Sequence, residues 1–134
     1  SQNARFGVNG VNIGLFCSTP MVALSRNISR KKTFEMLVTG DFLNANEAAK
    51  AGLINHVTKE IDLSNKTNEI AIKISEKFKR VVKIGKEAFY NQAEMNLKEA
   101  YEYTASIMAE NMTYEETNEG ISAFVEKRTP EWTE

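Results

Sequence analysis

The spacing of apolar residues in the second half of the chain most limits what it can fold into. Leu63, Ile70, Ile74 and Phe78 follow one another at intervals of seven, four and four residues, which bring side chains to one face of a helix. Similar apolar faces occupy residues 81–92, 97–108 and 113–125. The sequence therefore predicts four successive amphipathic helices after about residue 58, and their apolar faces require a partner surface.

Residues 1–57, by contrast, contain only brief strand-like runs. Residues 4–16 are rich in glycine, asparagine and β-branched or aromatic residues, as in a short strand followed by a close-packed loop. Residues 53–57, with the sequence LINHV, predict a second brief strand. Because an isolated pair of strands is only marginally stable in water, we expect partner strands to come from elsewhere.

Side chains suited to capping mark where several helices begin and end. A Ser, Thr or Asn residue can accept a hydrogen bond from the first turn, a Glu three residues later can return it, and glycine tolerates the left-handed turn that ends a helix. The predicted starts are Ser18 with Pro20 in the first turn, Ser29, and the capping boxes Asn44–Glu47 and Thr113–Glu116, and the predicted ends are Gly40 and Gly52.

The composition excludes several classes of protein. The 134 residues carry 17 basic and 18 acidic side chains, a formal charge of -1, which gives no reason to expect nucleic acid or a membrane surface as partner. One cysteine allows no internal disulfide framework and no cysteine-rich zinc site. Without a long apolar run or a signal peptide, the chain is expected to be soluble and intracellular. Its start at Ser1 rather than Met predicts a fragment or a processed chain.

Few side chains suggest chemistry of their own. His56, the only histidine, lies among apolar residues and is interpreted as a structural or surface histidine. Cys17 precedes a predicted helix, where a thiol pKa can fall, but a structural cysteine is the favoured interpretation. One basic group forms either a solvated face or a site for a phosphate-bearing ligand, and it consists of Arg26, Arg30, Lys31 and Lys32. Core or subunit interface is the interpretation of Tyr101, Tyr103, Ile107 and Met108. A basic helix end is the interpretation of Lys127 and Arg128. Nucleotide-binding glycine motifs are absent from the sequence.

Three segments together resemble one family. They are ARFGVNGVNIGL (residues 4–15), FEMLVTGDFLNANEAAKAGLINHV (residues 34–57) and NEGISAFVEKRTPEW (residues 118–132). In order and wording they are similar to the C-terminal half of the crotonase superfamily, the enoyl-CoA hydratase/isomerase family. The resemblance implies an α/β fold, the ClpP/crotonase-like ββα spiral, of which this chain is the mainly α-helical C-terminal part. Residues 1–57 would end the spiral core, and residues 58–134 would form a helical oligomerisation region.

The same resemblance implies a coenzyme A thioester as substrate or ligand, with no further cofactor and no metal. In such hydratases, backbone N–H groups polarise the thioester carbonyl and two glutamates move protons. One glutamate, the oxyanion-hole donors and most of the CoA cradle belong to the region N-terminal to this chain. The second glutamate matches Gly10, and neither Asn9 nor Asn12 beside it can act as a base. The chain has no catalytic residue by this reading, and alone it is expected to be inactive.

At the other end of the chain, the resemblance implies ligand contacts and assembly. Phe124 and Lys127 match positions that border the CoA ligand, with the lysine near its phosphates. The expected assembly is a homo-oligomer, a trimer or a dimer of trimers, located in the cytoplasm of a bacterium or the mitochondrial matrix of a eukaryote. Two alternatives stay open: another thioester reaction in the whole protein, such as isomerisation or hydrolysis, and a non-catalytic acyl-CoA sensor or oligomerising partner.

Overall fold

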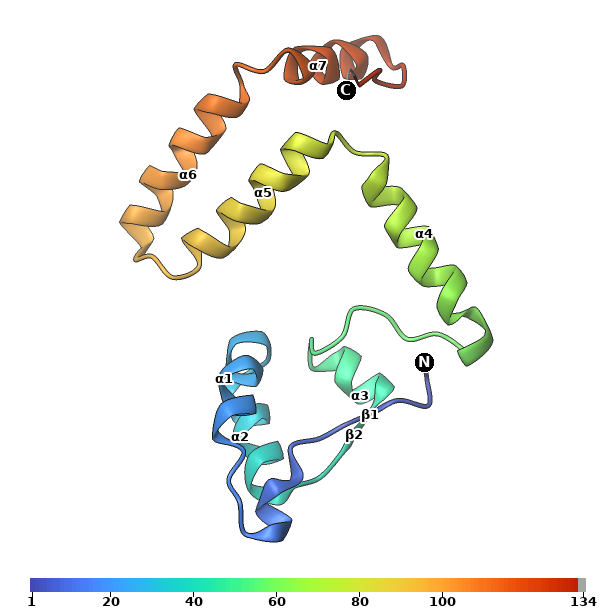
Figure 1. Ribbon diagram of the computed structural model, residues 1–134, viewed down its shortest axis with the longest axis vertical. Coiled ribbons are helices and arrows are strands. Elements are labelled where there is room, and N and C mark those ends of the chain that lie inside the picture. Colours follow the sequence, from blue (N-terminus) through green and yellow to red (C-terminus); the bar gives the residue numbers. More distant parts are fainter. Residues whose placement is uncertain (133–134) are drawn as a thin grey trace. The chain divides into compact units, whose positions relative to one another are not determined.

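The computed structural model describes residues 1–132, which are mainly helical, as predicted. They divide into two compact units, of which the first comprises residues 1–69 and the second begins at Ile70 (Figure 1). The helix α4, Leu63–Ser75, contains the point of division. The boundary that the sequence suggests, between residues 57 and 58, concerns the fold of a larger protein and stays a prediction.

The first unit is built from short elements around a two-stranded sheet. In chain order these are β1 (Arg5–Phe6), the 3-10 helix η1 (Asn9–Ile13), α1 (Ser18–Asn27), α2 (Arg30–Thr39), β2 (Leu43–Asn44), α3 (Ala45–Lys50) and the 3-10 helix η2 (Glu60–Asp62). The strands β1 and β2 are antiparallel, with Arg5 opposite Asn44 and Phe6 opposite Leu43. A sheet this small cannot stand alone in water. It depends on the helices that pack against it.

The prediction of a strand over residues 53–57 is wrong. The backbone N–H of Leu53 donates to the carbonyl of Ala48, 2.9 Å away. This hydrogen bond closes the C-terminal end of α3, so Leu53 does not pair with a strand. Leu53 and Ile54 instead pack against the buried core of the first unit. That core consists of Leu24, Ile28, Met36, Leu43 and Ala48.

Most of the predicted helix ends are confirmed. The Ser29 side chain accepts from the backbone N–H of Lys32 at the start of α2, and Gly40 ends that helix with a φ of 68°. Asn44 and Glu47 form the predicted capping box of α3, with bonds of 3.0 and 2.8 Å. Gly52 follows with a φ of 82°, a conformation that costs glycine nothing. The helix α1 does begin at Ser18, but its N-cap is Cys17, which makes no side-chain capping bond.

The second unit consists of the remaining helices, and the prediction of four successive helices is confirmed. These are the end of α4, then α5 (Lys79–Gln92), α6 (Leu97–Asn111) and α7 (Glu115–Glu126). The helices α5 and α6 form an antiparallel hairpin (Figure 1), in which the Asn91 side-chain amide donates to the Tyr103 hydroxyl over 3.1 Å.

Two local predictions in this unit are wrong. The helix α4 ends at Ser75, and Phe78 is instead the N-cap of α5. The predicted capping box of Thr113 and Glu116 does not form, because the Thr113 hydroxyl donates back to the carbonyl of Glu110 over 2.7 Å. The N-cap of α7 is Tyr114, without a side-chain capping bond.

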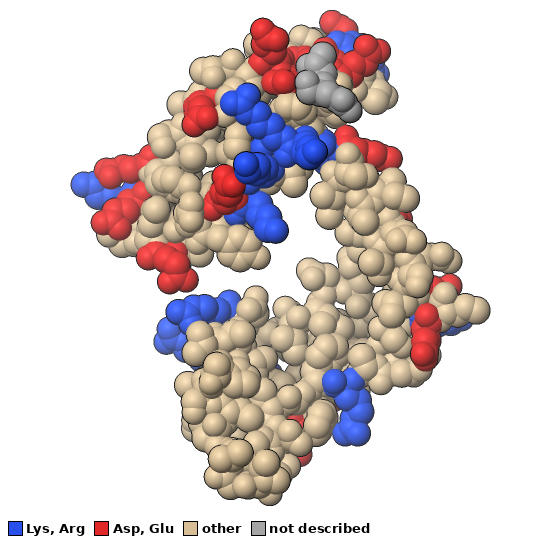
Figure 2. All heavy atoms as spheres, in the orientation of Figure 1, with Lys and Arg blue, Asp and Glu red and all other residues tan. Residues whose placement is uncertain are grey.

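Large apolar side chains remain exposed on both units. Phe89, Leu97 and Tyr101 are 63%, 75% and 71% exposed. Figure 2 shows broad areas without Lys, Arg, Asp or Glu side chains, most clearly over the first unit. The amphipathic faces that the sequence predicts therefore exist, and neither unit covers them by itself. Among the described helices, none has both the length and the apolar character needed to cross a membrane.

The capping box of α3 can be tested directly by mutation. Asn44→Ala removes an acceptor for the Glu47 N–H, so the free energy of unfolding should fall by about 1 kcal/mol. Urea denaturation followed by circular dichroism measures this change. Asn46→Ala, on the exposed side of the same helix, is the matched control and should not destabilise the protein. Equal stability of the wild type and Asn44→Ala would contradict the assignment.

Candidate functional site

The turn around Gly10 leaves no space for a side chain. Gly10 lies in η1, where its N–H donates to the Cys17 sulfur over 3.3 Å and its carbonyl accepts from the Leu15 N–H over 3.0 Å. A Cβ atom added to Gly10 would lie 2.7 Å from the Cys17 Sγ and 2.8 Å from the Leu15 carbonyl oxygen. The second contact is with backbone, which cannot rotate away. Glycine is therefore required by the closeness of the turn.

The two asparagines beside Gly10 differ in their surroundings. Asn9 begins η1 and is exposed. Asn12 lies against Gly40 at the end of α2, since a Cβ atom on Gly40 would meet both terminal atoms of the Asn12 amide at 2.8 Å. This contact ties η1 to the C-terminal end of α2. Both amides are neutral, so neither of these two side chains can act as a general acid or base.

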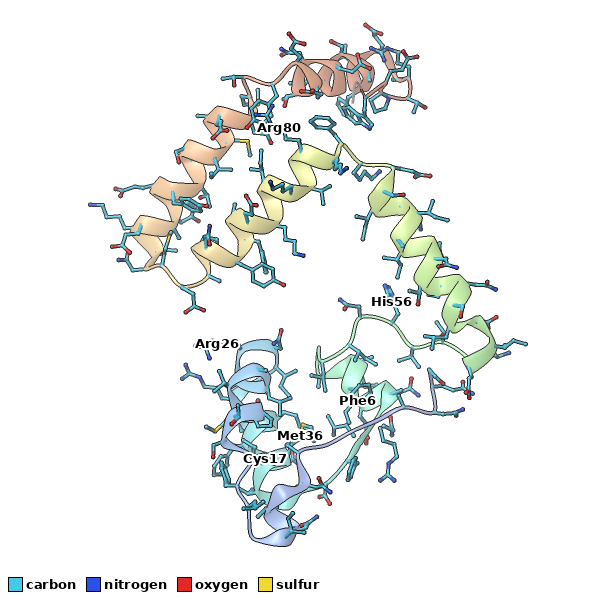
Figure 3. All side chains as sticks on the ribbon, viewed as in Figure 1. Phe6, Cys17, Arg26, Met36, His56 and Arg80 are labelled. Carbon is cyan, nitrogen blue, oxygen red and sulfur yellow. The ribbon has the colours of Figure 1, made fainter. Side chains whose placement is uncertain are left out.

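Cys17 contributes to the same turn and is half-buried (Figure 3). Its sulfur accepts the Gly10 N–H, which gives the thiol a structural use. His56 is exposed, in the segment between α3 and η2 (Figure 3). Of the basic group near α2, Lys32 is paired with Glu35 at 2.9 Å. These side chains do not converge on one point in the first unit.

Phe124 lies in an apolar pocket of the second unit. The pocket has a volume of about 570 Å³ and lies between α5, the end of α6 and α7. Phe124 itself is 81% exposed. Other side chains of its lining are Phe78, Val81, Met112, Ile121 and Trp132. Such a surface can take an apolar group of a ligand or of another protein segment.

Lys127 occupies the turn that ends α7. Its φ of 56° and ψ of 38° are left-handed. The Lys127 N–H donates to the Phe124 carbonyl over 3.3 Å, and the Arg128 N–H donates to the Ala123 carbonyl over 3.0 Å. These two bonds form a Schellman motif, which reverses the chain and leaves the Lys127 side chain exposed.

A carboxylate inside α7 holds the segment that follows this turn. The Glu119 oxygens pair with both terminal nitrogens of Arg128, at 2.6 and 2.8 Å, and one of them accepts the Glu131 N–H at 2.8 Å. The Arg128 Nε also donates to Glu126, at 2.6 Å. The bond from Arg128, reinforced by the Glu131 N–H, lowers the pKa of the Glu119 carboxyl to about 2. The Glu119 carboxylate in turn raises the pKa of the Arg128 guanidinium.

This arrangement is not predicted from the sequence, in which Arg128 is interpreted only as a favourable charge at a helix end. In the structure its guanidinium is engaged by two carboxylates. Glu119 and Arg128 are nine residues apart, which is not a helical neighbour spacing, so no helix rule indicates the pair. The sequence EGISAFVEKR does contain both residues, and only the chain reversal at Lys127 brings them together.

Trp132 packs against the beginning of α5 and against α7 in the second unit. Its indole N–H donates to the Glu76 carbonyl over 3.2 Å, and its ring centroid lies 5.8 Å from that of Phe78. A Cβ atom on Gly120 would lie 3.3 Å from the indole ring, so the ring rests closely on α7. The final segment is thus fixed by Glu119 at one point and by Trp132 at the next.

Within residues 1–132 there is no group of three or more His, Cys, Asp or Glu side chains that could hold a metal ion. The candidate features are therefore the closed turn at Gly10 in the first unit, and the pocket with Phe124 and the turn at Lys127 in the second.

The short strands and the helical hairpin are compatible with part of an α/β fold, and comparison with known sequences identifies the family. The profile of the family described as enoyl-CoA hydratase/isomerase matches residues 1–134. The chain belongs to this family. The crotonase fold is confirmed, and with it the assignment of the chain to the mainly helical C-terminal part of that fold.

Individual relatives show which group within the family this chain resembles. Enoyl-CoA hydratase domain-containing protein 3, mitochondrial, from Xenopus laevis is 44% identical over 133 residues, which are 99% of this chain and 45% of the relative. The human protein of that name is also 44% identical, with 44% of its length covered. Residues 10–26, GVNIGLFCSTPMVALSR, predict likeness to this group, which these matches confirm. The chain thus spans somewhat less than half the length of these relatives.

Solved structures give the same result. An enoyl-CoA hydratase from Mycobacterium smegmatis has a TM-score of 0.93 and 48% identity, covering 98% of this chain and 51% of that one. The human enoyl Coenzyme A hydratase domain-containing protein 3 has a TM-score of 0.89 and 44% identity, covering 96% of this chain and 51% of that one.

The close packing at Gly10 can be tested by adding one methyl group. Gly10→Ala must push the Leu15 carbonyl or distort η1, so the free energy of unfolding should fall by about 1–3 kcal/mol. Gly85→Ala, inside the exposed face of α5 with no atom within 4 Å, is the control and should raise stability by up to about 1 kcal/mol. Urea denaturation compares them. If the two variants behave alike, the turn is looser than described.

The ion pair at Glu119 predicts a specific pH dependence. The pKa of Glu119 is lower in the folded state, about 2, than its ordinary value of 4.5. Its contribution to stability is therefore complete above about pH 4.5 and is lost as the pH falls toward 2. Acid unfolding of the wild type should show a steeper loss in this window than that of Glu119→Gln. Parallel curves for the two proteins would show that the pair is not formed in solution.

Proposed function

We propose that this chain is the C-terminal portion of an acyl-CoA-binding crotonase-family protein that lacks ordinary hydratase activity. The ligand is a coenzyme A thioester, and the proposal requires no further cofactor and no metal. In this family, polarisation of the thioester carbonyl is the shared step, and it is effective because charge develops on an oxygen in a site with little water. That step depends on groups outside this chain, so the chain by itself is inactive.

The closed turn at Gly10 is the observation that carries the proposal. By the family resemblance, Gly10 stands where a hydratase has its second glutamate. The contacts with Cys17 and Leu15 support the idea that the backbone here has settled around a residue without a side chain. Protonation or deprotonation by a positioned carboxylate contributes about 10²- to 10⁴-fold to a rate. Asn9 and Asn12 can orient water or substrate, but they cannot replace that contribution.

Phe124 and Lys127 are the proposed ligand contacts within the chain. The exposed Phe124 ring in its apolar pocket suits the apolar part of the ligand. The exposed ammonium of Lys127 suits its phosphates. The uncovered apolar faces of α5 and α6 support assembly into a homo-oligomer. That it is a trimer or a dimer of trimers is proposed from the family resemblance alone. The relatives' names support a mitochondrial location if the source is a eukaryote. For a bacterial source we propose the cytoplasm.

Two other functions make different demands on the same site. A different thioester reaction, isomerisation or hydrolysis, would use the oxyanion hole with a base from the rest of the protein. A sensor or oligomerising partner would bind acyl-CoA without turning it over. The absence of an acid at Gly10 is compatible with both, and a panel of thioesters distinguishes them because only the first yields product.

The whole protein provides the test. Calorimetry should detect binding of coenzyme A or acetyl-CoA, and hydration of crotonyl-CoA should be at least about 100-fold slower than in a relative with both glutamates. At neutral pH, the hydration rate is measured from the loss of the absorbance of the conjugated enoyl thioester. Hydration at the rate of the two-glutamate enzyme would overturn the proposed role of Gly10, and failure to bind any CoA compound would overturn the ligand.

A further inference from the structure

The turn after α7 places a lysine where the backbone favours glycine. Among residues 1–132, Lys127 is the only non-glycine residue with positive φ. The chain uses glycine at its other left-handed positions, which are Gly14, Gly40 and Gly52. A side chain with a Cβ atom is disfavoured in this conformation. Its presence at position 127 therefore points to a role for the lysine side chain itself.

The residues on either side of Lys127 are both fixed by ion pairs. Arg128 is held by the two oxygens of Glu119 and by Glu126, all at 2.6–2.8 Å. The Glu119 carboxylate also accepts the Glu131 N–H. One carboxylate of α7 thus anchors the returning segment at two residues, Arg128 and Glu131. Ion pairs thus engage the residues on both sides of the left-handed Lys127.

We propose that Glu119 is a positioning residue for Lys127. By binding Arg128 it keeps the turn left-handed, and the turn presents the Lys127 ammonium to a phosphate group of the acyl-CoA ligand. This inference rests on the proposed function, in which Lys127 borders those phosphates. It assigns to Glu119 and Arg128 a role that neither would have as ordinary surface charges.

The chemistry of the turn supports this division of roles. The Arg128 guanidinium is occupied by two carboxylates, so it is poorly suited to meet a second anion. The Lys127 side chain is exposed beside it. A lysine has a long flexible chain, and a fixed backbone reduces the entropy that it loses when it binds. Release of the segment after α7 would increase that loss.

A double-mutant cycle on the whole protein tests the proposal, with affinity for coenzyme A measured by calorimetry. Lys127→Ala should weaken binding about tenfold, as expected for one charge-assisted bond. Glu119→Gln should weaken it about three- to tenfold, because the turn is released. The double variant should bind no more weakly than Lys127→Ala, since Glu119 acts only through the lysine. Glu115→Gln, the same charge change in the first turn of α7, is the matched control and should bind like the wild type.

Lys127→Gly provides a second readout that does not depend on the folding of Glu119→Gln. Glycine relieves the left-handed residue, so the melting temperature should rise while coenzyme A binds about tenfold more weakly. Wild-type affinity in this variant would overturn the role of the lysine side chain.

The possible failures are distinguishable. Additive losses in the cycle, or wild-type affinity in Glu119→Gln when Lys127→Ala is weakened, would overturn the positioning role and leave the proposed function intact. Wild-type affinity in Lys127→Ala would remove the lysine from the ligand site. A wild-type protein that binds no coenzyme A would overturn the proposed function, and this inference with it.

Discussion

Each unit of the chain carries more apolar surface than it can bury. The first unit closes a core of a few side chains around a sheet of two short strands. In the second, Tyr114 and Ala123 are the buried apolar side chains among the described residues, while whole faces of α5 and α6 remain exposed. Such surface is stable in water only when something covers it. The arrangement is that of a part of a larger fold, in agreement with relatives about twice as long.

The features that could be predicted from the sequence are those that depend on residues close to one another in the chain. The capping box of Asn44 and Glu47 and the left-handed Gly40 depend on a few adjacent residues, and the structure confirms both. The amphipathic helices depend on periodicity alone and were also predicted. The pairing of Phe6 with Leu43 was not, because two strands of two residues each carry no periodic signal. The end of α4 at Ser75 was missed because the apolar spacing continues through Phe78 into the next helix.

The residues of the candidate site are proposed from the family resemblance, whereas their geometry could not be predicted from the sequence. Resemblance pointed to Gly10, Phe124 and Lys127, yet nothing in the sequence shows that Gly10 touches the sulfur of Cys17 or that Lys127 is left-handed. Both facts depend on chain reversals that bring together residues seven to nine positions apart. Under the proposed function, Lys127 is an example of the conflict between stability and function, because glycine would suit the backbone and could not carry the charge.

The same geometry means that a glutamate at position 10, where we propose that the family has its second acid, would require more than a single substitution. A glutamate side chain needs a Cβ atom, and at Gly10 that atom would overlap the Leu15 carbonyl and the Cys17 thiol. To accept a glutamate, the loop from Leu15 to Cys17 must therefore move, and the hydrogen bonds at Gly10 must be replaced. The loop and the glycine form one structural unit. Replacement of glycine by glutamate at position 10, or of glutamate by glycine, therefore requires the loop to change as well. The identity of residue 10 depends on the whole turn.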